Sequence, residues 1–366
     1  RDMQATSPVT ACASTTTHLF LGTFQGKVIS IDLSDSSSRV FAEAPHEGPV
    51  RRVSASQDGK MVVTTSDDRK VVVWNVESGQ IHGTSSAPKR PLGAAFTLDG
   101  RAVVFACISG DVWQVEVANL AGAPRYLLGQ ISCLTDMMIS NDGKFVIIAD
   151  RDEKIRASHY PQCAEVQSFM LGHTQFVTCI AQPAGRPDRV LSGGGDGSLR
   201  MWDLMSGGEV AQLTLAASSE EDDAAGIVHG LVVGPAAADG THLAAVAILG
   251  TPQVHLVAVG PATLSLQRTI ELKASCSKLH IVGQTLVIAL DSEETCVLES
   301  LDGAAQVNDG LAQSIVSVVR SSSSTWPPTL SLASASLSVL HGVNKKRRRH
   351  EEPGWKHLTL KTGKAK

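Results

Sequence analysis

Two sets of side chains in this sequence combine a histidine, a hydroxyl residue and an aspartate, the residue types that activate a nucleophile in many hydrolases. The sets are His46, Thr64, Asp68 and Trp74, and His173, Ser192, Asp196 and Trp202. Both have nearly the same spacing, and both end in a tryptophan, which a catalytic relay does not require. The choice between a catalytic and a structural role therefore depends on the elements that carry these residues.

Short strand-like segments recur along the chain at even spacing. They begin at residues 28, 71, 112, 155, 199, 254 and 295, with steps of 41 to 44 residues and one step of 55. A period of about 40–45 residues with four short strands per unit is typical of propeller blades of the WD-repeat type. Helical periodicity is nearly absent over the first 340 residues. We therefore predict an all-β fold, a seven-bladed WD-repeat β-propeller.

The segment 171–204 resembles a WD repeat closely, with Gly172-His173 near its start and Trp202-Asp203 near its end. In that family, histidine, serine or threonine, aspartate and tryptophan form a hydrogen-bonded network within each blade, and both sets match this pattern. A buried histidine and aspartate need hydrogen-bond partners, which such a network supplies. The resemblance implies that both sets are structural networks, and we predict no catalytic residue.

Turns and termini complete this expected architecture. Asp-Gly pairs at 58–59, 99–100 and 142–143 indicate tight hairpins, because glycine tolerates positive φ. The acidic stretch 216–226 indicates a solvated loop within the 55-residue interval between the segments that begin at 199 and 254. We expect segments 311–320 and 329–340 to supply the last outer strands. We also expect residues 8–14 to complete the final blade and close the ring, which leaves no open sheet edge.

Other motifs with chemical potential are absent or have a structural explanation. The chain contains no H-E-x-x-H, no G-x-x-x-x-G-K-[ST] and no G-x-S-x-G motif. The segment GGGDG at 193–197 precedes a strand, whereas phosphate loops lead into a helix, so we interpret it as a hairpin turn. The seven cysteines are odd in number, and none form a C-x-x-C pair. We predict no metal site, no disulfide framework and a reducing compartment.

Composition separates an acidic body from a basic tail. The 366 residues are 43% hydrophobic with a net charge of −4, which argues against general electrostatic binding to nucleic acid or membrane. Residues 345–366 nevertheless carry nine Lys or Arg against two Glu. No signal-peptide pattern and no run of about 18 apolar residues occurs, so no membrane span is expected. We predict a propeller over 1–340 and a basic C-terminal tail over 341–366.

One repeat departs from the pattern. Aligned on the turn aspartates Asp68, Asp152 and Asp196, the tryptophan position of the middle copy holds Ser158. Six charged residues crowd this turn and the strand after it: Asp150, Arg151, Asp152, Glu153, Lys154 and Arg156. They form either a solvated turn or a charged docking patch for another protein. Strand alternation places Lys154 and Arg156 on the face opposite Ile155.

The pair of segments DRDEKIR (150–156) and LGHTQFV (171–177) is more specific than a WD dipeptide. It resembles the WD-repeat, non-catalytic subunit of the eukaryotic tRNA (guanine-N7) methyltransferase. The resemblance implies a heterodimer whose other subunit binds S-adenosylmethionine and methylates a guanosine in the tRNA variable loop. It implies that this chain needs no cofactor of its own and that the six charged residues bind the catalytic subunit. Arg156 is the first choice, since a guanidinium contacts a carboxylate in a bidentate manner.

Five consecutive cations follow the last expected strand: Lys345, Lys346, Arg347, Arg348 and Arg349. Such a run indicates a nuclear localisation signal or contact with RNA phosphates, and a solubilising tail is the alternative. We expect a nuclear protein that binds its catalytic partner and, through the complex, tRNA. A general WD-repeat adaptor is the alternative function, whereas an independent enzyme lacks any motif.

Overall fold

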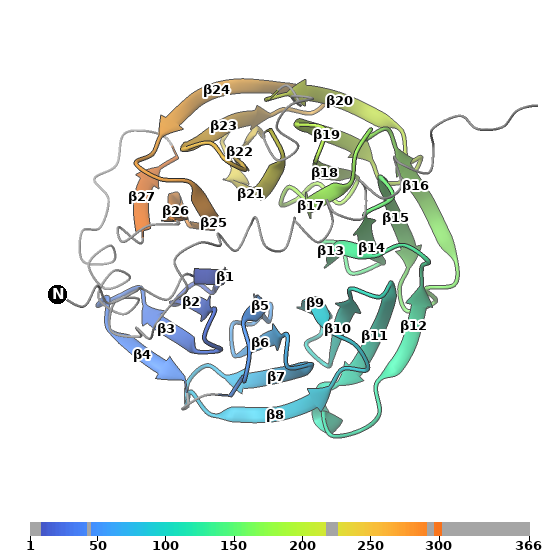
Figure 1. The fold of residues 1–366 in the computed structure, drawn as a ribbon, viewed down its shortest axis with the longest axis vertical. Coiled ribbons are helices and arrows are strands. Elements are labelled where there is room, and N and C mark those ends of the chain that lie inside the picture. The colour runs from blue at the N-terminus through green and yellow to red at the C-terminus, as the bar shows by residue number, and fades with distance from the viewer. Residues whose placement is uncertain (1–8, 42–44, 217–225, 291–295, 302–366) are drawn as a thin grey trace, which may run out of the picture.

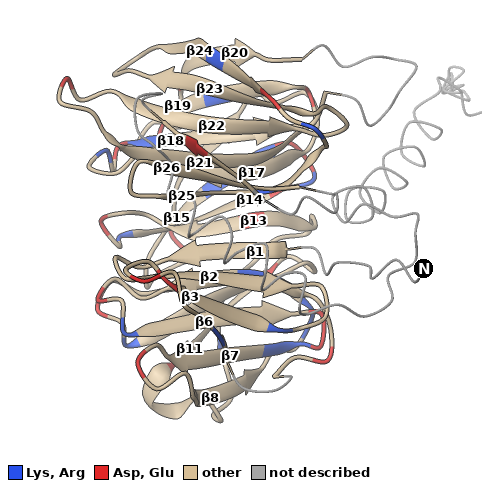
Figure 2. Cartoon of the chain, turned by 90° about the vertical axis from the view of Figure 1, so that its left-hand side faces the viewer, with Lys and Arg blue, Asp and Glu red and all other residues tan. Residues whose placement is uncertain are grey.

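The computed structural model describes residues 9–41, 45–216, 226–290 and 296–301, and these form seven β-sheets arranged in a ring (Figure 1). Six sheets are four-stranded antiparallel meanders, and three strands of the seventh are described. The structure thus confirms the predicted seven-bladed propeller. Figure 2 shows the ring from the side, with Lys, Arg, Asp and Glu concentrated toward the two faces where the turns project.

The blades follow one another in chain order. Blades one to four contain β1 (Val9–Ser14), β2 (His18–Thr23), β3 (Val28–Asp32), β4 (Ser38–Phe41); β5 (Val50–Ala55), β6 (Met61–Ser66), β7 (Lys70–Asn75), β8 (Ile81–Ser86); β9 (Pro91–Phe96), β10 (Ala102–Cys107), β11 (Asp111–Glu116), β12 (Arg125–Gly129); and β13 (Leu134–Ile139), β14 (Phe145–Asp150), β15 (Lys154–His159), β16 (Val166–Leu171). Blades five to seven contain β17 (Val177–Ala181), β18 (Arg189–Gly194), β19 (Ser198–Asp203), β20 (Glu209–Thr214); β21 (Val228–Ala236), β22 (His242–Ile248), β23 (Gln253–Val259), β24 (Leu264–Glu271); and β25 (Cys276–Val282), β26 (Thr285–Leu290), β27 (Cys296–Ser300). A short 3-10 helix, η1 (Val117–Asn119), follows β11.

The seven segments that defined the repeat are the third strands of the seven blades, β3, β7, β11, β15, β19, β23 and β27. The Asp-Gly pairs lie between the first and second strands of blades two, three and four. Gly59, Gly100 and Gly143 have φ values of 70°, 68° and 72°, a region that glycine enters without steric cost. The repeat was therefore predicted correctly from its strand spacing and turn chemistry.

The core lies between neighbouring blades, where β-branched side chains of adjacent sheets meet. Val63 and Val73 of blade two pack with Val103 and Phe105 of blade three, and all four are fully buried. Strands rich in valine and isoleucine suit such two-sided burial. Each blade is thus stabilised mainly by its neighbours, which fixes the positions of the turns on both faces.

The predicted ring closure by residues 8–14 is wrong. Residues 9–14 form β1, which pairs antiparallel with β2 as the innermost strand of blade one. A three-residue turn after Ser14 joins the two strands, and hairpin pairing across so short a turn is strongly favoured. Blade one instead meets blade seven through side chains, with Leu21 and Ile29 packed against Val287 and Ala289.

Several other expectations fall outside the described residues. These are the outer strands at 311–320 and 329–340, the domain boundary at 340 and the tail 341–366, and most of the acidic loop. Within the described residues, no helix is long and apolar enough to cross a membrane.

Candidate partner-docking surface

The structure brings together the four residues of each Ser/Thr-His-Asp-Trp set. In blade five, His173 Nε2 lies 2.7 Å from Ser192 Oγ, and Trp202 Nε1 donates to the same hydroxyl at 2.8 Å. His173 Nδ1 lies 3.0 Å from Asp196 Oδ2. Because Ser192 and Trp202 are fully buried, this hydroxyl is not accessible to a substrate.

The set in blade two repeats this geometry. His46 Nε2 lies 2.8 Å from Thr64 Oγ1, Trp74 Nε1 donates to Thr64 Oγ1 at 3.0 Å, and His46 Nδ1 lies 3.1 Å from Asp68 Oδ2. Burial lowers the pKa of His46, and the neighbouring Asp68 partly offsets this shift. Each network links the third strand of its blade to the chain segment that leads into the first strand.

The aspartate of the blade-five network is stabilised as an anion. Burial raises the pKa of Asp196, but hydrogen bonds from His173, Ser198 and the backbone of Thr174 outweigh burial, so the net shift is downward. The network therefore connects the turn that carries Asp196 to the buried side chains of blade five.

Blade four has neither the tryptophan nor its hydroxyl acceptor. The registers Val146↔Ser158 in blade four and Val190↔Trp202 in blade five show that Ser158 occupies the tryptophan position. By the same registers, Ile148 occupies the position of Ser192. A different contact holds this blade, since Gln130 Nε2 donates a short hydrogen bond to Asp150 Oδ2.

Gln130 was missed by the sequence analysis, although a signal for it exists. It precedes Asp152 by 22 residues, the same spacing that separates His46 from Asp68. The glutamine thus replaces the network histidine of blade four, and its carboxylate partner lies two residues before the turn aspartate.

Asp150 was predicted as a partner-binding residue, but its side chain is 0% exposed. Its Oδ1 accepts the backbone N–H of Lys154 at 3.0 Å, and burial raises its pKa. The carboxylate therefore supports the turn from inside, because a group that must satisfy buried donors cannot also face a partner. Three residues further on, Glu153 is exposed and has a φ of 70°.

The remaining charged residues lie at the surface. Arg151 and Asp152 pair with each other, with 3.5 Å between Nε and Oδ1. Lys154 Nζ donates to the backbone carbonyl of Asp152 at 3.4 Å. Arg156 is partly buried: its Nε donates to Ser158 Oγ at 2.9 Å, and its Nη2 donates to a backbone carbonyl, that of Cys163, at 3.2 Å.

Burial lowers the pKa of Arg156, and within the described residues no carboxylate lies within ion-pair distance of it. Arg200 occupies the same position in blade five, four residues after the turn aspartate. Arg200 forms ion pairs with Asp196, at 3.5 Å, and with Glu209. Val166 takes the position of Glu209 in blade four, as the registers Ser158↔Val166 and Trp202↔Glu209 show.

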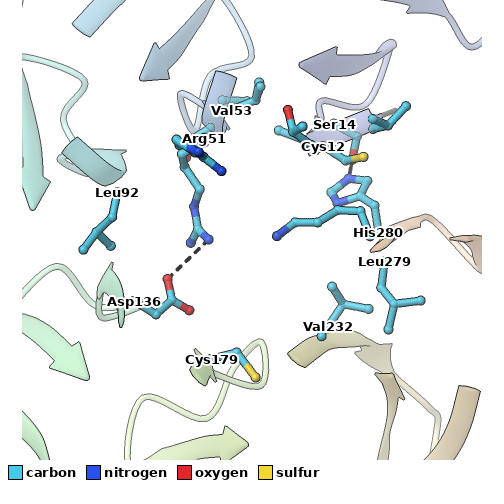
Figure 3. Close-up of a pocket in the computed structure, with 18 of the residues that line it drawn as sticks. Cys12, Ser14, Arg51, Val53, Leu92, Asp136, Cys179, Val232, Leu279 and His280 are labelled. Atoms are coloured by element: carbon cyan, nitrogen blue, oxygen red, sulfur yellow. Dashed lines mark hydrogen bonds and ion pairs between the residues drawn. The ribbon is translucent and has the colours of Figure 1, made fainter. Parts of the chain in front are cut away.

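The inner strands line a cavity of about 1570 Å³ along the axis of the ring (Figure 3). Arg52 pairs with Asp136 across this cavity, with 3.3 Å between Nη1 and Oδ1, and His280 Nε2 lies 2.9 Å from Ser14 Oγ. Burial lowers the pKa of His280 to about 4 and raises that of the Cys12 thiol to about 12. Among the described residues no carboxylate contacts the other ring nitrogen of His280.

A group of three or more His, Cys, Asp or Glu side chains able to hold a metal does not occur in the described part of the chain. The five predicted RNA-binding cations, Lys345 to Arg349, lie outside the described residues.

Comparisons with known proteins place this surface in context. The family model described as tRNA methyltransferase TRM82 WD40 domain matches residues 116–308, and a model of the WD domain, G-beta repeat, matches residues 37–75. The chain is 32% identical over 275 residues to tRNA (guanine-N(7)-)-methyltransferase non-catalytic subunit wdr4 of Danio rerio, covering 73% of this chain and 66% of the relative. It is 33% identical over 173 residues to the subunit WDR4 of Homo sapiens, covering 47% and 42%. The chain thus spans less than two thirds of the length of these relatives.

Among solved structures, the Myceliophteria thermophila Cps50 (Swd1) beta-propeller domain superposes with a TM-score of 0.68, covering 82% of this chain and 99% of that chain. At 12% identity this likeness shows the fold alone.

Proposed function

Because the chain belongs to the tRNA methyltransferase TRM82 WD40 domain family, we propose that it is the non-catalytic subunit of a tRNA (guanine-N7) methyltransferase. The relatives from Danio rerio and Homo sapiens carry that description. In this proposal a separate subunit binds S-adenosylmethionine and methylates a guanosine in the tRNA variable loop. The propeller binds that subunit, stabilises its active form and helps to position the tRNA.

The observation that carries the proposal is the contrast between Arg156 and Arg200. Both occupy the same position in neighbouring blades, but only Arg200 has carboxylate partners within the described residues. A partly buried guanidinium without a carboxylate is costly, and a carboxylate from another chain removes that cost. Glu153 is exposed in the turn that leads into the strand of Arg156, so the surface offers both signs of charge, as an interface that fixes orientation does.

The buried hydroxyls support a non-catalytic role. Thr64 and Ser192 each lie within hydrogen-bond distance of a network histidine that also contacts an aspartate, and both are fully buried. Each accepts a hydrogen bond from a tryptophan indole, so each is engaged in packing its blade.

For the basic tail we propose nuclear import and contact with tRNA phosphates. The five cations from Lys345 to Arg349 match the composition of both kinds of segment. Phosphate contacts release counterions, so tail-dependent tRNA binding should weaken steeply as salt is raised. Deleting residues 345–366 should reduce both the tRNA affinity of the complex and its salt dependence, and unchanged affinity would exclude the RNA role.

The test is a tRNA N7-guanine methylation assay with this chain alone, the catalytic subunit alone, and both co-expressed. We expect activity only or mainly in the co-expressed pair, together with co-purification of the two chains. Absence of stimulation and of co-purification would refute the proposal and favour a general WD-repeat adaptor. Arg101→Leu serves as a surface control in the co-expressed pair, since that side chain is 84% exposed in a different turn.

A further inference from the structure

Three large apolar side chains are exposed around the charged turn of blade four. Ile131 is 105% exposed, Leu171 is 61% exposed and Phe169 is 46% exposed. Single exposed hydrophobic residues are common on soluble proteins and need no explanation. Several such residues close to Lys154 and Arg156 indicate an interaction surface.

Hydrogen bonds fix Ile131 beside the turn. Its neighbour Gln130 donates to Asp150, and the backbone N–H of Arg151 donates to the carbonyl of Cys133 at 2.9 Å. The loop that carries Ile131 is therefore joined to both the last residue of β14 and the first residue of the turn. A side chain presented from so constrained a loop is pre-organised for binding.

Strand register places Phe169 and Leu171 on the same face of the sheet as the cations Lys154 and Arg156. Lys154 pairs with Leu171 and Arg156 pairs with Phe169 across β15 and β16. Directly paired residues of antiparallel strands project from the same face of the sheet. The opposite face carries Ile155 and its partner, which are buried in the core against blade five. The face of Arg156 meets blade three, because its partner Ile148 on β14 packs with Val104 and Leu128. Leu171 and Phe169 on the outermost strand nevertheless stay largely exposed, so packing within the ring does not account for them.

We propose that Ile131, Phe169 and Leu171 form the apolar centre of the docking surface for the catalytic subunit. This inference rests on the proposed function and names the chemistry of the partner segment, which is an amphipathic segment with apolar side chains flanked by carboxylates. The carboxylates pair with Arg156, which has no ion-pair partner among the described residues, and with Lys154, whose charge also interacts with that of Asp150.

The apolar contacts and the charge pairs depend on each other. Apolar side chains that exclude water lower the local dielectric and strengthen an adjacent ion pair. The ion pairs in turn select a segment with the correct charges and orient it on the apolar residues. Affinity therefore depends on Ile131 and Leu171 together with Arg156, and not on the charged turn alone.

The test measures the dissociation constant between the full chain and its catalytic subunit for Ile131→Asp and Leu171→Ser. Leu266→Ser is the matched control, since Leu266 is 48% exposed on β24 of blade six. Burial of one such side chain corresponds to a change in affinity of about tenfold or more. We expect that loss for each blade-four variant and no change for the control, with unchanged thermal unfolding in all three because the side chains are exposed.

A double-mutant cycle adds a second readout. Ile131→Asp combined with Arg156→Leu should weaken binding by less than the product of the single effects, because the two residues serve one contact. Blade-four variants that bind as tightly as wild type would refute the apolar centre while the accessory-subunit function stands. A wild-type chain that does not bind the catalytic subunit would refute the function and this inference together.

Discussion

Replacing Arg156 by leucine should weaken binding to the catalytic subunit while the propeller stays folded. The guanidinium lies partly buried on β15, held by Ser158 Oγ at 2.9 Å and by the carbonyl of Cys163 at 3.2 Å. Its Nη1 has no hydrogen-bond partner among the described residues. Leucine keeps the apolar part of the side chain and removes the charge and both internal hydrogen bonds.

The two expected effects differ in size. Loss of two partly buried hydrogen bonds should lower the free energy of unfolding by about 1–2 kcal/mol. Loss of one partner of a desolvated charge pair should cost the complex about 2–5 kcal/mol, or roughly thirtyfold to several thousandfold in affinity. The variant should therefore remain folded and still fail to assemble at concentrations where wild type is fully bound.

The assay is titration calorimetry with the catalytic subunit, alongside urea unfolding of the isolated chain. A second variant, Val166→Glu, keeps Arg156 but places a carboxylate where Glu209 pairs with Arg200 in blade five. If Arg156 acts through an unpaired charge, Val166→Glu should also weaken assembly. Wild-type affinity in both variants would refute the reasoning, and so would a loss of affinity in Arg156→Leu that follows unfolding.

Three further predictions concern the propeller itself. Trp202→Phe removes the indole hydrogen bond to Ser192 Oγ, 2.8 Å long, and should lower the free energy of unfolding in urea by about 1–3 kcal/mol. Gly197→Ala should be more destabilising than Gly100→Ala in the same assay: both have positive φ, but only at Gly197 would the new Cβ lie 2.3 Å from a backbone carbonyl oxygen. Burial lowers the pKa of His280 from 6.5 to about 4, so the unfolded state binds more protons between these values. The contribution of His280 to stability should be fully present above pH 6.5 and fall toward pH 4 by up to about 1.4 kcal/mol per pH unit. His229 has the same shift, so His280→Gln should reduce the slope without abolishing it.

The repeat was predictable because its signals are local. Strand alternation and Asp-Gly turns depend on residues close together in sequence, and the third strand of every blade was found from them. Ring closure was not predictable in this way, because β1 is a short alternating strand that fits either end of the ring. The three-residue turn between β1 and β2 determines the pairing of β1. We predicted a different pairing because an N-terminal strand usually completes the last blade of a WD-repeat propeller.

The proposed docking surface can be inferred from the sequence only in part, because it draws on several elements. The charged turn and the missing tryptophan are visible in sequence, and they indicated blade four. The burial of Asp150 depends on Gln130, which lies 20 residues away, and the exposure of Leu171 depends on its register with Lys154. Strand alternation does not reveal which polar residue faces inward when a neighbouring loop supplies its donor.

The loss of the tryptophan in blade four follows from the loss of its acceptor. The position of Thr64 and Ser192 holds Ile148, so an indole N–H at position 158 would be buried without a partner, at a cost of about 1–3 kcal/mol. Ser158 avoids that cost and accepts the Nε of Arg156 instead. The blade is held instead by the hydrogen bond from Gln130 to Asp150, and it orients a guanidinium by two internal hydrogen bonds. An arrangement that fixes a cation without neutralising it lowers the entropy that must be lost on binding, so in the proposed complex this blade gains a pre-organised contact where other blades have the tryptophan.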